Sequence, residues 1–323
     1  MSIVIQSGMI EDLVVSNDPH SPGNVVLRWL NGDDPNQLWT EESAPNGFYL
    51  RNSATGTYLS ATGGDSPVVL NPHGDIWQKT GPDDQLSAIR LALNTSQNLN
   101  ALGGSPYVGT PIGTWSWGGG AGNETWLIAN VASLWPRQSS KLTFITGMAP
   151  YLQLAVKPTD VSGALVVDDN YSSGSPAANF AFTVIQWFSG FSIVSQASGL
   201  LAYVSGNGNG AQLLQRPADQ MNTDAVWTYG SSGGPFQAVR PWINSGQNWN
   251  VFGNPHPIPK GPLAMGTWSW GGGQANEVWQ AAPPSEVRRA APTELWRPEA
   301  VPAEMLQARM PGNGAGRSAP LPH

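Results

Sequence analysis

The chain carries a long internal duplication. The eight residues GTWSWGGG at 113–120 return unchanged at 266–273, an offset of 153. Upstream, AIRLALNTSQNLNALGG at 88–104 aligns without gaps to AVRPWINSGQNWNVFGN at 238–254, an offset of 150, and a three-residue insertion in HPIPKGP accounts for the difference. Such a repeat constrains the fold before any local pattern does. The chain is therefore a unit of about 140 to 150 residues written twice.

Each half divides again into three shorter units. Every unit ends in a closing aromatic residue, and the closing residues recur about every 40 to 50 positions. They are Trp39, Trp77, Trp126, Phe182, Trp227 and Trp279. Within each unit, short apolar runs alternate with Gly, Asn or Ser clusters, which is typical of strands joined by turns. Recurrence once per unit predicts that the closing aromatics form a core layer.

Three β units that cannot each bury a face can close into one barrel, which removes exposed strand edges. We therefore predict an all-β chain with two tandem domains, residues 1–135 and 136–283, each with six barrel strands and three capping hairpins. The 38 glycines and 28 prolines supply the turns, and 40% hydrophobic residues suffice for a core in each half.

Residues 284–323 lie outside every repeat and are rich in Pro, Ala and Arg. This composition predicts a disordered tail. Trp296 favours a second interpretation, in which the tail docks on the repeats, on another copy of the chain in a homo-oligomer, or on a partner protein.

Several function classes are disfavoured. The four histidines are far apart, and there is no cysteine, G-x-S-x-G, phosphate loop or H-E-x-x-H motif, so we expect no enzyme, metal or cofactor. A formal charge of −7 with 15 Lys and Arg argues against nucleic acid. We also see no membrane span and no signal peptide, which predicts a cytoplasmic protein or one exported without a leader.

Two segments carry a resemblance to a known family. NVVLRWLNGDDPNQLWT at 24–40 and TPIGTWSWGGGAGNETW at 110–126 resemble the ricin B-chain type β-trefoil lectins, whose repeats carry a mid-repeat Trp and end in N-Q-x-W. The resemblance spans residues 3 to 283 and is strongest at Gln37-Leu38-Trp39. It implies two tandem β-trefoils and a glycan-binding function.

The resemblance also implies site residues. The mid-repeat position, at which the family stacks a sugar ring, reads Trp29, Trp115 and Trp268. The amide position that binds sugar hydroxyls reads Asn36, Asn123 and Asn276. Many members place an Asp near the start of the repeat, and that position reads Val14, Asn100 and Asn250 here. Units three and six therefore keep a full polar set, whereas unit one has an aliphatic anchor. The other three units have no mid-repeat Trp.

Two alternatives stay open for Trp115 and Trp268, because they could also pack a hairpin onto the barrel or join the two domains. Trp117 and Trp270 are interpreted as scaffold. The preferred function is a non-enzymatic, multivalent lectin that binds glycans of glycoproteins, glycolipids or polysaccharides. The alternative is an assembly or receptor-binding subunit with vestigial sugar sites.

Overall fold

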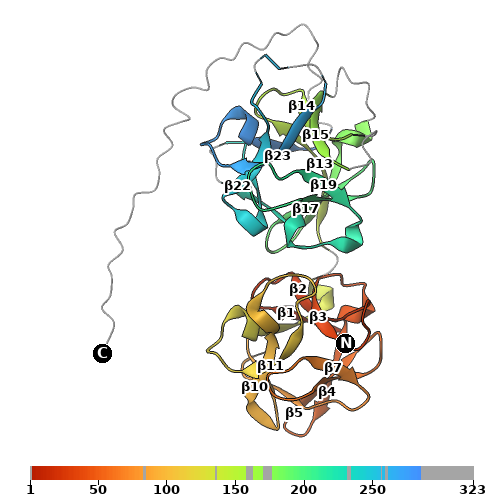
Figure 1. Ribbon diagram of the computed structural model, residues 1–323. Helices are drawn as coiled ribbons and strands as arrows, with labels where there is room; N and C mark the ends of the chain where they lie inside the picture. Colours follow the sequence, from red (N-terminus) through yellow and green to blue (C-terminus); the bar gives the residue numbers. More distant parts are fainter. Residues whose placement is uncertain are drawn as a thin grey trace, which may run out of the picture.

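The computed structural model describes residues 2–82, 85–134, 137–157, 163–169, 177–230, 234–255, 257–258 and 261–284. These residues form β-strands and short 3₁₀ turns, with no α-helix among them. The two halves of the sequence make two separate lobes stacked end to end (Figure 1). No helix in the described part of the chain is long and apolar enough to cross a membrane.

The first lobe is a closed barrel capped by hairpins. Its barrel strands are β1 (Ile3–Ser7), β4 (Trp39–Ala44), β5 (Gly47–Asn52), β8 (Trp77–Lys79), β9 (Ile89–Leu91) and β12 (Trp126–Asn130). Neighbouring strands in this series pair antiparallel, β1 also pairs with β12, and a bridge between Ser87 and Trp126 closes the circle. The hairpins are β2 (Leu13–Asn17) with β3 (Val25–Trp29), β6 (Tyr58–Ala61) with β7 (Val68–Asn71), and β10 (Asn94–Ala101) with β11 (Ile112–Ser116).

The second lobe repeats this plan. Its barrel strands are β13 (Ser139–Thr146), β16 (Phe182–Gln186), β17 (Phe191–Ser195), β20 (Trp227–Gly230), β21 (Ala238–Pro241) and β24 (Trp279–Ala282). Its hairpins are β14 (Leu152–Val156) with β15 (Leu165–Asp169), β18 (Leu201–Val204) with β19 (Leu213–Arg216), and β22 (Gln247–Val251) with β23 (Leu263–Ser269). Each lobe is therefore a β-trefoil, which confirms the predicted fold class.

The six closing aromatics begin or adjoin the returning strands and are at most 1% exposed. Four of them donate their indole Nε1–H to a backbone carbonyl of the hairpin in the same unit, over 2.9 to 3.2 Å. These donors are Trp39, Trp77, Trp126 and Trp279. A buried indole needs such an acceptor. Their prediction as a core layer is confirmed.

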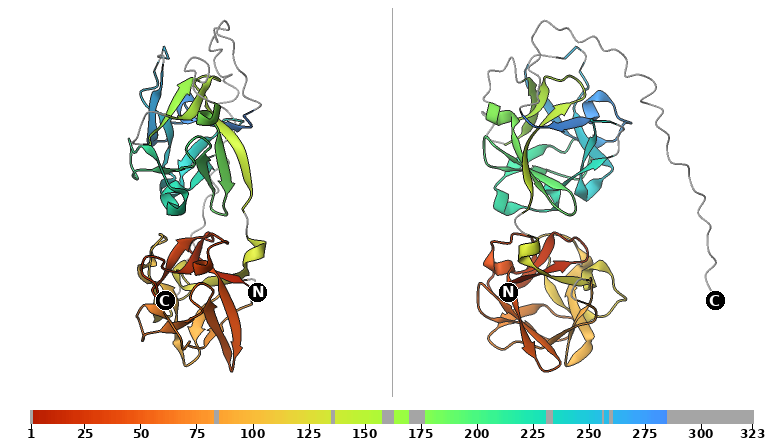
Figure 2. Two further views of the ribbon diagram at one scale, coloured as in Figure 1. Left: turned by 90° about the vertical axis from the view of Figure 1, so that its right-hand side faces the viewer. Right: turned by 180° about the vertical axis from the view of Figure 1, so that it is seen from behind.

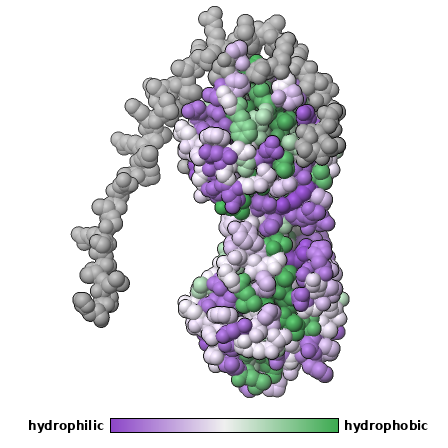
Figure 3. Space-filling view, in the orientation of Figure 1, coloured by the Kyte–Doolittle hydropathy of each residue, from purple (hydrophilic) through white to green (hydrophobic). Residues whose placement is uncertain are grey.

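The lobes meet at a narrow waist, which Figures 2 and 3 show from several sides. The indole of Trp29 meets that of Trp187 edge-on there, and both rings belong to the first lobe's core cluster. Beside them, the fully buried Asp12 accepts hydrogen bonds from the guanidinium of Arg137 at 2.8 Å and from the backbone N–H of Ser189 at 3.0 Å. Burial lowers the pKa of Arg137, and the carboxylate of Asp12 counteracts this shift.

The link between the lobes runs from the end of β12 at Asn130 to the start of β13 at Ser139. Independent folding of fragments 1–135 and 136–283 stays a prediction. Residues 285–323 lie outside the described residues, and with them the tail's Trp296 and its predicted docking.

Candidate functional site

The repeated GTWSWGGG forms the last strand of a capping hairpin in each lobe and the glycine turn after it. Trp115 pairs with Asn98 across the first hairpin, and Trp268 pairs with Asn248 across the second. The preceding Thr114 and Thr267 are fully buried, whereas Trp115 is 47% exposed and Trp268 is 46% exposed. Because neighbouring side chains in a strand point to opposite faces, the pattern buries the threonines and leaves both indoles open to solvent.

The glycine run is explained by a buried carboxylate. Glu124 is 5% exposed and accepts hydrogen bonds from the backbone N–H of Gly118 at 2.9 Å and of Gly120 at 3.2 Å. Gly120 has a φ of 94°, and a Cβ on Gly118 would lie 2.7 Å from Glu124 Oε1. The second lobe repeats the arrangement with Glu277. Glycine is therefore required here for backbone conformation and for close approach.

This carboxylate replaces the glutamine of the family signature. In unit one, Gln37 accepts from the backbone N–H of Asn31 at 2.7 Å and donates to the carbonyl of Trp29 at 2.8 Å. A carboxylate has only acceptors, so Glu124 and Glu277 are suited to loops that offer several N–H donors. This function of Glu124 and Glu277 was not predicted from the sequence. Its signal was the coincidence of three glycines with N-E-x-W in place of N-Q-x-W.

The second tryptophan of each repeat lies against an arginine of a barrel strand, Arg90 of β9 or Arg240 of β21. The guanidinium of Arg90 lies 5.0 Å from the ring of Trp117, and that of Arg240 lies 5.3 Å from the ring of Trp270. A Cβ on Gly120 would touch the edge of Trp117 at 3.4 Å. These contacts support the structural interpretation of Trp117 and Trp270.

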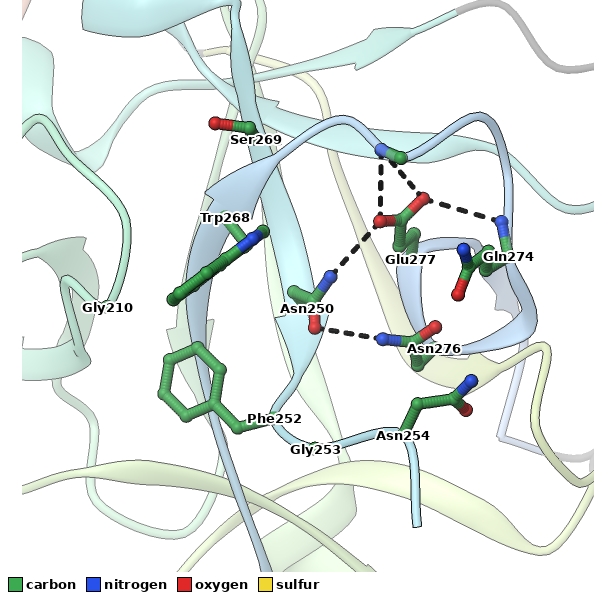
Figure 4. Close-up of a pocket in the computed structure, with 11 residues that line it drawn as sticks. Gly210, Asn250, Phe252, Gly253, Asn254, Trp268, Ser269, Gln274, Asn276 and Glu277 are labelled. Atoms are coloured by element: carbon green, nitrogen blue, oxygen red, sulfur yellow. Dashed lines mark hydrogen bonds between the residues drawn. The ribbon is translucent and has the colours of Figure 1, made fainter. Parts of the chain in front are cut away.

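A pocket of about 500 Å³ opens beside Trp268 in the second lobe. Figure 4 shows Trp268 and Phe252 on one side of it, with Asn250, Asn254 and Asn276 on the other. The two rings are 6.3 Å apart at an angle of 71°. One wall is therefore aromatic and the other presents amides, which is the usual mixture in a small-ligand site.

The amides of this pocket have a fixed orientation. Asn250 Nδ2 lies 3.4 Å from Glu277 Oε1, and Asn276 Nδ2 donates to Asn250 Oδ1 at 3.0 Å. The carboxylate can only accept, so it fixes which end of each amide is oxygen. No described residue donates to Asn276 Oδ1, although Asn276 is only 6% exposed. This oxygen is a buried acceptor at the pocket wall.

The first lobe holds a similar arrangement of residues around Trp115. Asn123 Nδ2 donates to Asn100 Oδ1 at 3.0 Å, as its counterparts do in the second lobe. The duplication places Leu102 where the second lobe has Phe252, and Gly104 where it has Asn254. The structure thus brings together each set predicted for units three and six: Asn100, Trp115 and Asn123, and Asn250, Trp268 and Asn276.

The arrangement in unit one differs from the prediction. Trp39 donates its Nε1–H to the carbonyl of Val15, and Trp126 donates to the carbonyl of Leu99, so Val15 and Leu99 are equivalent positions in units one and three. The next residue in each strand is then also equivalent, which places Ser16, and not Val14, in the position of Asn100. Val15 pairs with Leu27, and Leu99 pairs with Thr114. In this register Arg28 corresponds to Trp115, and Trp29 lies one residue beyond.

A shift of one residue moves a strand side chain to the opposite face. Trp29 is 6% exposed and packs against Trp187, so the alignment of Trp29 with Trp115 is wrong, and no sugar ring reaches its face in this arrangement. Asn36 accepts a hydrogen bond from Asn17 Nδ2 at 2.8 Å, and its own Nδ2 donates to Asp34. Unit one therefore has no Trp and amide pair of the kind found in units three and six.

The domain-contact alternative for Trp115 and Trp268 is also not observed, because the described lobe contact is made by Trp29 and Trp187. Among the residues with described positions, no group of three or more His, Asp or Glu side chains is arranged to hold a metal ion.

No protein-family model matches the sequence, and no curated protein matches it. Similar solved structures include a mosquitocidal holotoxin at 18% identity and a TM-score of 0.39; the likeness covers 87% of this chain and 33% of the toxin, so the chain spans only about a third of that protein. A ricin B-like lectin of Macrolepiota procera is 20% identical with a TM-score of 0.36, over 40% of this chain and 95% of the lectin. The agglutinin from Abrus precatorius is 14% identical with a TM-score of 0.37, over 87% and 96% of the two chains. The chain is thus similar to lectins of the ricin B type and to toxins.

Proposed function

We propose that this protein is a non-enzymatic lectin that binds glycans at the capping hairpins of units three and six. The observation that carries the proposal is the half-exposed indole of Trp268 beside a pocket whose opposite wall presents amides. The C–H face of a pyranose is apolar and packs on an indole, while its hydroxyls need fixed donors and acceptors. This pocket supplies both.

The amides of Asn250 and Asn276 form the polar part of this proposal. Asn250 is held between Asn276 and Glu277, so the orientation of both amides is fixed before a sugar binds. The amide chain thus takes the place of the Asp found in many family members.

The pocket favours neutral sugars. Among the described residues that line it, Glu277 is the only charged one, and its two oxygens accept from the backbone N–H groups of Gly271, Gly273 and Gln274. None of these described lining residues is a cation that could pair with a sialic acid or a sulfate. The carboxylate is only 4% exposed and already bonded, so it acts as scaffold rather than as an acid or base.

Two sites on one chain favour targets that carry many copies of a glycan, such as glycoproteins, glycolipids or polysaccharides. A single shallow sugar site binds with a Kd of about 0.1 to 1 mM. Simultaneous engagement of a second site increases the apparent affinity by about a hundredfold or more when the spacing fits.

The test is a broad array of neutral and acidic glycans with the full chain and three variants. We expect binding to neutral glycans, weaker binding after Trp268→Ala or Trp115→Ala, and none after both changes. Tyr229→Ala is the matched control, because Tyr229 is an aromatic residue of similar exposure, 45%, on the barrel strand β20 and outside both capping hairpins. Undiminished binding by the folded double variant would show that these hairpins are not the sites.

A further inference from the structure

Unit one has a cavity where units three and six have their Trp sites. This cavity has a volume of about 380 Å³ and lies between the lobes. Five of its lining residues are equivalent in sequence position to lining residues of the second-lobe pocket. The equivalent pairs are Arg28 and Trp268, Trp29 and Ser269, Asn31 and Gly271, Asp34 and Gln274, and Gln37 and Glu277. The sugar-stacking position is thus occupied by a guanidinium group.

The second lobe supplies the opposite wall of this cavity. Its contribution is mostly apolar: Ile185, Trp187, Val194, Leu201 and Met221. Val108 adds an apolar side chain from the first lobe. A partly open cavity of this size with apolar walls and a few polar groups, located between two domains, has the usual character of a small-molecule site. It does not have the open indole face of a sugar platform, because Trp29 is buried against Trp187.

One hydrogen-bond donor at the cavity has no partner among the described residues. Arg28 is half-buried, and no described acceptor or carboxylate pairs with its guanidinium. The acidic residues that line the cavity differ from one another. Asp34 already accepts from the backbone N–H and side-chain Nδ2 of Asn36, and Asp219 is exposed, so water screens its charge.

From these groups we propose that the cavity between the lobes binds a small organic carboxylate with an apolar body. The guanidinium of Arg28 binds the carboxylate, because its planar fork matches two carboxylate oxygens. The apolar body lies against Ile185, Leu201 and Met221. This site is independent of the glycan sites proposed above and shares no residue with them.

The chemistry is tested with probes that share one apolar chain. Hexanoate, hexanol and hexylamine are titrated against the full chain and followed by ligand-observed NMR. We expect saturable binding of hexanoate, binding of hexanol weaker by about tenfold, which is the usual effect of losing a charge-assisted bond, and no binding of hexylamine. Glucuronate, whose carboxylate sits on a polar ring, is expected to bind less well than hexanoate. Equal binding of hexanol, or tighter binding of glucuronate, overturns the proposal.

Variants locate the site. Arg28→Gln should reduce hexanoate affinity about tenfold, to the level of hexanol. Arg51→Gln is the control for loss of an exposed Arg, and Trp268→Ala is the control for the glycan site. Both should leave hexanoate binding unchanged. Unchanged affinity in folded Arg28→Gln contradicts the proposal, whereas loss of glycan binding alone would concern only the lectin function.

Discussion

Trp29 and Trp187 meet across the two lobes with their ring centroids 5.5 Å apart and their planes at 90°. Edge-to-face pairs of this kind are stabilising beyond the area that they bury. Trp187 is a residue of the second trefoil, yet it belongs to the hydrophobic cluster of the first, together with Val226. The lobes are therefore coupled by a shared extension of one core.

Replacing Trp187 with Ala should uncouple the lobes. Because the indole is 7% exposed and also donates its Nε1–H to Ser192 at 2.9 Å, the loss should be about 3 to 5 kcal/mol. In denaturant, the two lobes should unfold in separate transitions, with the first at lower concentration than in the wild type. Leu93→Ala is the control, since Leu93 is 94% exposed. A single transition at the wild-type midpoint would argue against the coupling.

Asp12→Asn should destabilise the same contact by an electrostatic route. The Asp12 carboxylate pairs with Arg137, and both side chains are at most 9% exposed. Removing one partner leaves a buried cation uncompensated, which typically costs about 3 to 5 kcal/mol. Glu11→Gln removes an exposed charge that also acts on Arg137, and it should cost less than Asp12→Asn because water screens the Glu11 carboxylate. Chemical denaturation of the two variants measures this difference, and equal stability would mean that water reaches the pair.

Glu277→Gln should disturb the glycine turn although it changes few atoms. If the amide oxygen of Gln accepts from Gly271, its NH₂ faces the N–H groups of Gly273 and Gln274, donor against donor. Gln37→Glu should destabilise unit one because acceptor would then face acceptor: one carboxylate oxygen would lie against the carbonyl of Trp29, which now accepts from Gln37 Nε2. Each change should cost about 1 to 3 kcal/mol.

Thermal melts of both single variants test this pair of predictions. The other amide orientation satisfies Gly273 and Gln274 but turns the NH₂ of Gln toward Asn250 Nδ2, so in that orientation Asn250 loses its acceptor and glycan binding should also weaken. A Glu277→Gln protein with wild-type melting temperature and glycan affinity would contradict the assigned function of the carboxylate.

Much of the fold could be predicted from the sequence, because repetition and periodicity are local properties. Closing aromatics once per unit predicted the core, and all six are buried. The duplication also predicted equal surroundings for Trp115 and Trp268, whose exposures differ by one percentage point, 47% against 46%.

Unit one shows why the candidate sites were harder to predict. The sequence VVLRW presents a Trp near the expected place, but the register of β2 with β3 places Arg28 there instead. A register is set by pairing and burial across strands, and a one-residue shift reverses the face. The burial of Trp29 also depends on Trp187, 158 positions further along the chain, which no local pattern shows.

The last prediction distinguishes a ligand-binding indole, Trp268, from a core indole, Trp279, within unit six. Trp279 is 1% exposed, donates its Nε1–H to the carbonyl of Trp249 at 3.1 Å and lies at the centre of the second core. Trp279→Ala should therefore cost about 3 to 5 kcal/mol. Trp268 is 46% exposed, and its loss should cost about 1 kcal/mol or less, since little apolar area leaves the core.

Both variants are compared by denaturant unfolding and by glycan titration. We expect Trp268→Ala to keep nearly all stability and lose binding at its site, and Trp279→Ala to lose stability first and binding only in proportion to the unfolded fraction. The contact of Trp268 with Phe252 is the one feature that opposes this expectation, because it ties the ring to the barrel cap. If Trp268→Ala unfolds as readily as Trp279→Ala, the indole is scaffold, and the sugar would have to be held by Asn276 and its neighbours alone.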